Sequence, residues 1–394
     1  MFDLEEILKN TLKKKAKVKK SSNIEKKLEE FLPGSYIDKE KNVFLVEFRY
    51  TLPLKHGNYL LKHFDIPEIV CKWAGIDKPI LLTDLIFYET ETTGLSGGTG
   101  TWVFLAGIGR FTNSEFILNQ FFMADPVCEE AYLLAIKKKF SDPVIPVSFN
   151  GRSYDANLLN TRCIINDILP FLADKPDIDL LYLARRFWKR NLGKCNLNHL
   201  EERLLGLSRD SEDDLPSEDI PQLYFEFLDS GNDWILKNVF SHNRVDILSL
   251  PVLFSIISEA LNNKSDVQAD KAGIGRLFHE YGNIIKAEEN FRIGINGKEA
   301  SICRKHLSFL YKKQGRISEA KELWIQAADT EIYAHVELAK LAEHNEKNFI
   351  QALKWTDCAL DLCWKNDYTS GKIIAALQKR KKRLLRKIER SRKK

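Results

Sequence analysis

The sequence predicts an α/β domain with a mixed sheet, followed by an all-α domain built from helical repeats. Three observations lead to this prediction. Three strand-like segments with short connections lie between residues 84 and 122, and helical and strand-like segments alternate after them. From about residue 270 a pattern of small and aromatic residues recurs at a fixed period. A chain of 394 residues is also too long for one ordinary core.

Composition indicates a globular protein of the cytoplasm. Hydrophobic residues make up 44% and charged residues 29% of the chain. There is no apolar run of about 18 residues and no secretory signal at the N-terminus, so no membrane partner is expected. The seven cysteines are scattered singly, without the paired spacing of a zinc site or a disulfide frame. Reduced thiols in a cytoplasm are therefore expected.

The net charge of +5 is unevenly distributed. Residues 379–394 hold eleven Lys or Arg and one Glu, and residues 9–20 hold seven Lys and no acid, so the remainder is acidic. Two basic arms on an acidic body are typical of a protein whose arms bind nucleic acid. Simple solvated ends are the alternative.

The segments before the α/β domain carry a weaker pattern. Residues 1–30 are interpreted as a basic, helical or frayed N-terminal arm. Residues 31–82 are interpreted as an N-terminal embellishment packed on the next domain, with strand character at Asn42–Tyr50.

The α/β domain is expected to span residues 83–262. Its predicted strands are Asp84–Thr90, Thr101–Phe111 and Glu115–Phe122 as an antiparallel meander, and then Val144–Phe149. Its predicted helices are Glu129–Phe140, Asn157–Ile168, Leu180–Arg190, Leu197–Leu205, Pro221–Leu228 and Trp234–Leu261. Pro251 should kink the last helix or split it in two. This order is that of the ribonuclease H-like α/β core, with flanking helices around a meander and parallel strands.

Residues 270–378 contain an internal repeat. Gly282, Ala287 and Phe291 recur 33 residues later as Gly315, Ala320 and Trp324, and a looser copy follows at Ala352, Trp355 and Ala359. This period is typical of tetratricopeptide-type helical hairpins, which present concave surfaces to protein partners. An irregular helical domain with chance spacing is the alternative. The basic tail 379–394 is expected to continue the final helix.

The segment from Ile86 to Leu95 carries the first candidate functional residues. Glu89 and Glu91 alternate in a predicted strand, so their carboxylates should share one face. Two like charges side by side are unfavourable unless a cation lies between them, and Mg²⁺ prefers such oxygen ligands. The alternative is an edge strand with two solvated glutamates.

Two later segments supply further ligands. Asp155 follows a strand, and His242 and Asp246 lie four residues apart on one face of a predicted helix. Four carboxylates and one imidazole could form a two-metal site for phosphodiester chemistry, in which His242 orients a water or takes its proton. The alternatives are that Asp155 caps a helix, that His242 is an ordinary histidine, and that Asp246 pairs with Arg244 or another cation.

Other motifs predict less. The glycine-rich segment Ser96–Thr101 lacks the Gly-Lys-Ser/Thr ending of a P-loop, so no nucleotide cofactor is expected and the segment is interpreted as a turn. Asp179 is interpreted as a helix N-cap. Tyr88, Trp102 and Tyr154 are either stacking platforms for bases or core residues.

The segments Phe87–Leu95, Asn150–Asp155 and His242–Asp246 resemble the three motifs of the DEDD exonuclease superfamily. With Ser96–Thr101, Ile178–Leu181, Cys195–Leu197 and His242–Leu250, the chain more narrowly resembles the YprB-type ribonuclease H-like proteins, including their C-terminal helical repeats. The resemblance implies a 3′→5′ exonuclease acting on DNA or RNA with two Mg²⁺ or Mn²⁺ ions.

By residue, the resemblance places metal ligands at Glu89, Glu91, Asp155 and Asp246, a general base at His242, and Glu91 also in catalysis. It places Thr92, Gly94, Leu95, Asn150 and Tyr154 in substrate-binding positions. Two positions depart from the family pattern. Glu89 stands where the family has aspartate, and His242 has the spacing to Asp246 of the tyrosine-type branch. These departures favour a second hypothesis, a catalytically impaired adaptor that binds nucleic acid or protein.

Overall fold

The computed structural model describes residues 28–38, 43–94, 98–141, 143–208, 215–264, 269–365 and 370–392. The chain divides into two compact units, Met1–Ala269 and Asp270–Lys394, called here the α/β unit and the helical unit. Most of the predicted N-terminal arm and the candidate residue Leu95 lie outside the described residues, so the predictions for them stay predictions.

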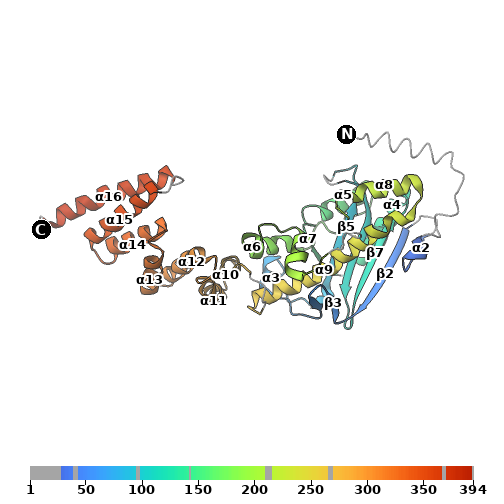
Figure 1. Ribbon diagram of the computed structural model, residues 1–394, viewed down its shortest axis with the longest axis horizontal. Coiled ribbons are helices and arrows are strands. Elements are labelled where there is room, and N and C mark those ends of the chain that lie inside the picture. Colours follow the sequence, from blue (N-terminus) through green and yellow to red (C-terminus); the bar gives the residue numbers. More distant parts are fainter. Residues whose placement is uncertain are drawn as a thin grey trace. The chain divides into compact units, whose positions relative to one another are not determined.

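The α/β unit is built on a seven-stranded mixed sheet in the order β1-β2-β7-β6-β5-β8-β9 (Figure 1). The strands are β1 Gly34–Asp38, β2 Val43–Thr51, β5 Leu85–Thr92, β6 Val103–Phe111, β7 Glu115–Met123, β8 Ile145–Ser148 and β9 Ile178–Asp179. Strands β5, β6 and β7 form the predicted antiparallel meander, and β8 and β9 run parallel to β5. Strand β2 pairs with β7, so the segment predicted to pack on the core also extends its sheet. A small hairpin joins β3 Leu54–His56 to β4 Tyr59–Leu61.

Helices flank this sheet. They are α2 Leu28–Phe31, α3 Glu68–Trp73, α4 Glu129–Lys139, α5 Asp155–Ile165, α6 Leu180–Leu192, α7 Leu197–Leu200, α8 Ile220–Ser230 and α9 Lys237–Leu261. Short 3₁₀ turns occur at Leu82–Asp84, Pro126–Cys128 and Asp233–Leu236, and a π-helical turn at Glu201–Leu205. Pro251 does not split α9, because Leu250, Val252 and Leu253 around it are buried and their burial outweighs a cost of about 3 kcal/mol for an interior proline.

Helix α9 packs closely on the sheet because β6 carries glycines beneath it. A Cβ added at Gly107 would lie 2.3 Å from Asn243 Oδ1 and 2.6 Å from Ile247 Cγ1. Gln120 on β7 donates to the carbonyl of Phe240 at 2.8 Å and to Asn243 Oδ1 at 3.0 Å. Gly107 is paired with Glu89 of β5, so this close approach brings α9 next to the acidic end of β5.

The helical unit consists of α10 Lys271–Glu280, α11 Ile284–Gly294, α12 Ala300–Lys313, α13 Ile317–Ala327, α14 Ile332–His344, α15 Phe349–Lys365 and α16 Gly371–Arg392. The 33-residue period in the sequence of this unit corresponds to equivalent positions in its helices. Gly282 and Gly315 precede equivalent helices with φ of 78° and 77°, a conformation that favours glycine. The repeated positions Ala287, Phe291, Ala320 and Trp324 are all buried.

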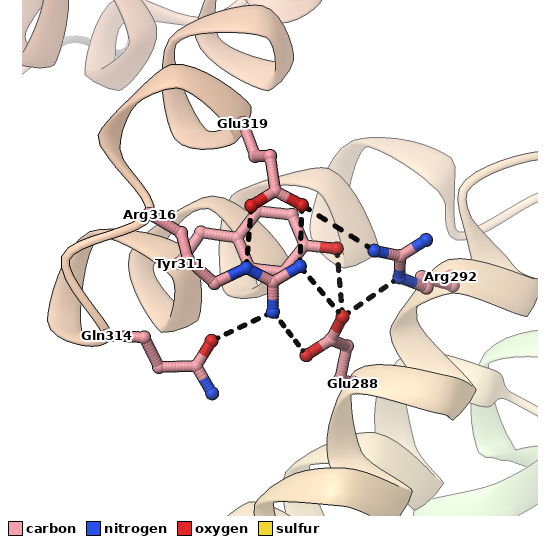
Figure 2. Close-up of polar contacts among 6 residues, drawn as sticks. All are labelled: Glu288, Arg292, Tyr311, Gln314, Arg316 and Glu319. Atoms are coloured by element: carbon pink, nitrogen blue, oxygen red, sulfur yellow. Dashed lines mark hydrogen bonds and ion pairs between the residues drawn. The ribbon is translucent and has the colours of Figure 1, made fainter.

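A polar network joins two successive helical pairs of this unit (Figure 2). Arg316, at the start of α13, donates to Glu319 at 2.6 Å and to Glu288 of α11 at 2.7 Å. Its guanidinium lies 3.9 Å from the centre of the Tyr311 ring of α12. Burial opposes ionisation of Glu288, but hydrogen bonds from Arg316 and Arg292 outweigh it and lower its pKa. The network therefore links α11, α12 and α13 through one arginine.

Candidate active site

The two glutamates of β5 face helix α9. Glu89 is paired with Gly107 and Phe87 with Gly109, and both glycines lie beneath Ile247 of α9. Because side chains alternate along a strand, Glu91 shares the face of Glu89, as the sequence predicts. The site therefore begins where β5 ends and α9 crosses it.

Helix α9 brings His242 and Asp246 to Glu91. One ligand atom from each of these three residues lies within 4.8 Å of the other two. His242 Nε2 is 3.5 Å from Asp246 Oδ2, and both side chains are buried. Arg244 does not pair with Asp246, because its guanidinium lies over the ring of Phe48 at 5.0 Å.

Asp155 enters the site from the other side of β5. It is the first residue of α5, where Tyr154 holds the cap position, so Asp155 is not the N-cap. Its Oδ1 accepts a hydrogen bond from Thr90 Oγ1. Thr90 lies between the two glutamates of β5, which places Asp155 beside the same strand end.

Asn150 and Asp179 fix the loop that leads into α5. Asn150 adopts φ of 67°, uncommon for a residue other than glycine, and its N–H donates to Asp179 Oδ1 at 2.8 Å. The same oxygen accepts from Leu181 N at 3.0 Å, so Asp179 is the N-cap of α6 as the sequence predicts.

The carboxylates raise one another's pKa. Burial raises the pKa of Glu89 well above its usual range, and Asp155, Asp246, Glu91 and Glu201 add to the effect in that order. Burial also raises the pKa of Asp155 to about 6, although the hydrogen bond from Thr90 opposes this. These carboxylates lie close together, so they ionise readily only when a positive charge is present between them. Carboxylate oxygens are also the ligands that a hard divalent cation prefers. The residues present therefore fit a hard divalent metal ion.

Glu201 is a buried acid near the cluster that the sequence did not reveal. It is 1% exposed and begins the π-helical turn after α7. Its negative charge adds to the rise in the pKa of Glu89, after burial and the charges of Asp155, Asp246 and Glu91.

Three of the candidate substrate-binding residues contact one another. The Tyr154 hydroxyl donates to the carbonyl of Gly94 and lies 3.0 Å from Thr92 Oγ1. This contact holds the end of β5 against the start of α5. Tyr88 is 2% exposed and is a core residue, and Trp102 is half-buried against the same core.

A basic pocket of about 580 Å³ adjoins the acidic cluster. Glu89, Asn150 and Asp246 line it next to the cluster, and Arg185, Lys189 and Lys194 line it as well. All three cations are exposed, and no carboxylate in the described part of the chain pairs with them. These cations were not predicted as site residues, although the i, i+4 spacing of Arg185 and Lys189 on an amphipathic helix is a usable signal.

A mixed sheet of this order with an acidic cluster at the end of β5 is consistent with a ribonuclease H-like protein. Residues 86–258 match the model of the RNase_H superfamily. The chain is also similar to the uncharacterized protein YprB of Bacillus subtilis (strain 168), with 31% identity over 344 residues that cover 82% of each protein. The chain therefore belongs to the family of YprB, and its residues 86–258 form a domain of the RNase_H superfamily. Proteins of this superfamily are usually phosphodiester hydrolases.

Two general features complete the description. Among the described residues, every helix is too short or too polar to cross a lipid bilayer. None of the seven cysteines forms a disulfide bond in the structure.

Proposed function

We propose that this protein is a metal-dependent nuclease that removes nucleotides from the 3′ end of DNA or RNA, using two Mg²⁺ or Mn²⁺ ions. The observation that carries the proposal is the convergence of Glu89, Glu91, Asp155, Asp246 and His242 from three separate elements beside a basic pocket. Superfamily membership supports the hydrolytic class. The direction of cleavage rests on the resemblance of the three motifs to DEDD exonucleases.

The four carboxylates would hold the ions, and His242 would act as the general base. When bound, such ions stabilise developing negative charge on phosphate and lower the pKa of water. Asp246, at 3.5 Å, orients the His242 imidazole, and histidine can accept a proton from an attacking water near neutral pH. Burial of both side chains keeps this pair in a fixed geometry.

The basic pocket would bind the phosphates next to the scissile bond. Arg185, Lys189 and Lys194 are exposed and form no ion pair with a carboxylate in the described part of the chain, so they are available to a polyanion. Asn150 lines the same pocket, and Thr92, Gly94 and Tyr154 form its proposed neighbouring wall at the end of β5. Cleavage should therefore weaken as salt increases.

The first test is degradation of 3′- and 5′-end-labelled single-stranded DNA and RNA in Mg²⁺ and in Mn²⁺. Wild type should shorten the strand stepwise from the 3′ end, and Asp246→Asn should lose at least about 10²-fold in rate. Asp77→Asn, an exposed aspartate away from the site, is the matched control and should retain wild-type activity. Equal residual activity in wild type and Asp246→Asn would contradict the proposal.

A second candidate is a catalytically impaired adaptor. Glu91, His242 and Asp246 form the close group of donors, and Glu89, one methylene longer than the family's aspartate, is outside it. In this hypothesis the helical unit, as a tetratricopeptide-type array, binds a protein partner through its groove of about 710 Å³ lined by α12, α14 and α16. Glu89→Asp separates the two candidates: a large gain in turnover would favour an impaired site, and a loss would show a site adapted to glutamate.

A further inference from the structure

Helix α16 contains two functionally different sets of basic residues. The first set binds Glu343 of α14, whose side chain is fully buried. Arg380 Nη1 and Arg383 Nη2 lie 2.8 and 2.7 Å from Glu343 Oε2, and Lys387 Nζ lies 2.9 Å from Oε1. Burial opposes ionisation of Glu343, but Arg383 and Lys387 outweigh it and lower its pKa to about 2. These three cations therefore form ion pairs that hold α16 in place.

The apolar face of α16 is buried against the neighbouring helices. Leu377, Leu384 and Ile388 are buried at 3%, 0% and 9% exposure. Leu377 packs with Ala359 and Leu360 of α15, and Leu384 with Ala342 and Ala352. The two large apolar side chains of α16 that are exposed, Ile373 and Leu385, lie twelve residues apart and form no continuous apolar face, which an amphipathic helix needs for insertion into a lipid surface.

The second basic set lies on the opposite side of the helix. Lys379, Lys382, Arg386 and Arg390 follow one another at spacings of three, four and four residues, so they form one stripe about 16 Å long. At about 100° per residue this stripe points away from the buried leucines. All four side chains are exposed, and no carboxylate among the described residues pairs with them. The only acid of α16 is Glu389.

We propose that this stripe binds the phosphate backbone of nucleic acid without reading its sequence. A row of unpaired cations on a rigid helix matches the charge of a polynucleotide. Helix α16 has no aromatic residue to stack on bases, which favours backbone contact over base recognition. The stripe is distinct from the basic pocket of the α/β unit, and its role does not require that the chain cleave nucleic acid.

The test compares two full-length variants of equal charge in EDTA, where cleavage is suppressed. The stripe variant carries Lys379→Gln, Lys382→Gln, Arg386→Gln and Arg390→Gln. The control carries Lys298→Gln, Lys313→Gln, Lys354→Gln and Lys365→Gln, all exposed positions of the same unit. Affinity for labelled single-stranded DNA and RNA is measured over a range of salt concentrations. Four lost phosphate contacts should reduce the slope of log K against log salt by about 2.8, at about 0.7 per contact.

The outcomes separate this proposal from the nuclease proposal. A reduced slope in the stripe variant but not in the control supports the stripe, whether or not wild type cleaves in Mg²⁺. Equal losses in both variants, or an unchanged slope in the stripe variant, would overturn it. The proposal would also be overturned if the stripe variant bound nucleic acid normally but no longer bound phosphatidylserine vesicles. The partner of the stripe would then be a membrane surface. Unchanged melting temperatures verify that both variants fold.

Discussion

At the scale of single residues, the acidic cluster works against the stability of the protein that holds it. The pKa of Glu89 is raised by burial and by four neighbouring acids, and that of Asp155 is raised to about 6. A carboxyl whose pKa is higher in the folded state contributes stability that is present at acidic pH and lost as the pH rises through the folded value. The metal-free protein should therefore lose stability as the pH rises from about 4 to about 6 through the ionisation of Asp155, and Glu89 should add a further loss above pH 4.5.

Glu89→Gln should relieve this repulsion. In EDTA at pH 8 we expect its melting temperature to exceed that of wild type, by about 2–4 °C for each kcal/mol of repulsion removed. The gain should shrink at pH 5, which lies below the folded-state pKa of about 6 for Asp155 and where the raised pKa of Glu89 favours its neutral form. Mg²⁺ or Mn²⁺ should raise the melting temperature of wild type more than that of the variant.

Thermal melts at both pH values check this expectation, with Glu130→Gln as the control because Glu130 is a solvent-exposed glutamate of α4. A variant that melts below wild type at pH 8 in EDTA would show that the Glu89 carboxylate is stabilising without a metal ion.

Some residues of this cluster could be predicted from the sequence and others could not. Glu89 and Glu91 follow the two-residue period of a strand, and His242 and Asp246 follow the four-residue spacing of a helix, so both pairs were predictable. Asp155 required the family motif, because a helix N-cap looks the same in sequence. Glu201 could not be found, because its effect on Glu89 depends on where the turn after α7 lies in the folded unit.

At the scale of elements, the contact between α9 and β6 sets the geometry of the site. Gly107→Ala should disturb it, because the new Cβ would meet Asn243 Oδ1 at 2.3 Å and the helix would have to shift. We expect a stability loss of about 1–3 kcal/mol from overpacking. A displacement of His242 and Asp246 by about 1 Å could lower the rate about 10²-fold.

Denaturant unfolding and the nuclease assay measure the two effects separately. Gly100→Ala is the matched control, since no atom lies within 4 Å of its added Cβ. If Gly107→Ala retained wild-type activity and stability, α9 would not be held at this distance by the glycine.

The sequence predicted which elements form better than how they pack. The meander and its parallel neighbours were predictable from alternation and short connections, as was the helix over Lys237–Leu261. The effect of Pro251 was not, because the burial of its neighbours depends on the assembled core. The basic pocket likewise forms only when the α6 cations are brought beside Glu89 and Asp246.

At the scale of the whole molecule, charge is divided between two units with different tasks. The α/β unit concentrates acids at its site, and the helical unit carries the basic helix α16. The 33-residue repeat predicted a helical array, but the sequence showed only a run of basic residues in the tail. The burial of Glu343 decides which of those residues hold the helix and which remain exposed.

Glu343→Gln should therefore loosen α16 while leaving the α/β unit intact. Removing one member of a buried ion pair costs about 3–5 kcal/mol, because Arg380, Arg383 and Lys387 would lose their carboxylate. Hydrogen exchange measured by mass spectrometry should show faster exchange in α16 and unchanged exchange in β5, β6 and β7.

The pKa of about 2 for Glu343 also predicts how the stability of wild type depends on pH. The stabilisation by Glu343 should be complete above pH 4.5 and lost as the pH falls towards 2, and the variant should lack this dependence. Glu322→Gln, an exposed position of α13, should match wild type. Unchanged exchange in α16 of Glu343→Gln would show that the leucine face alone holds the helix, and faster exchange in β5–β7 would show that the two units are coupled.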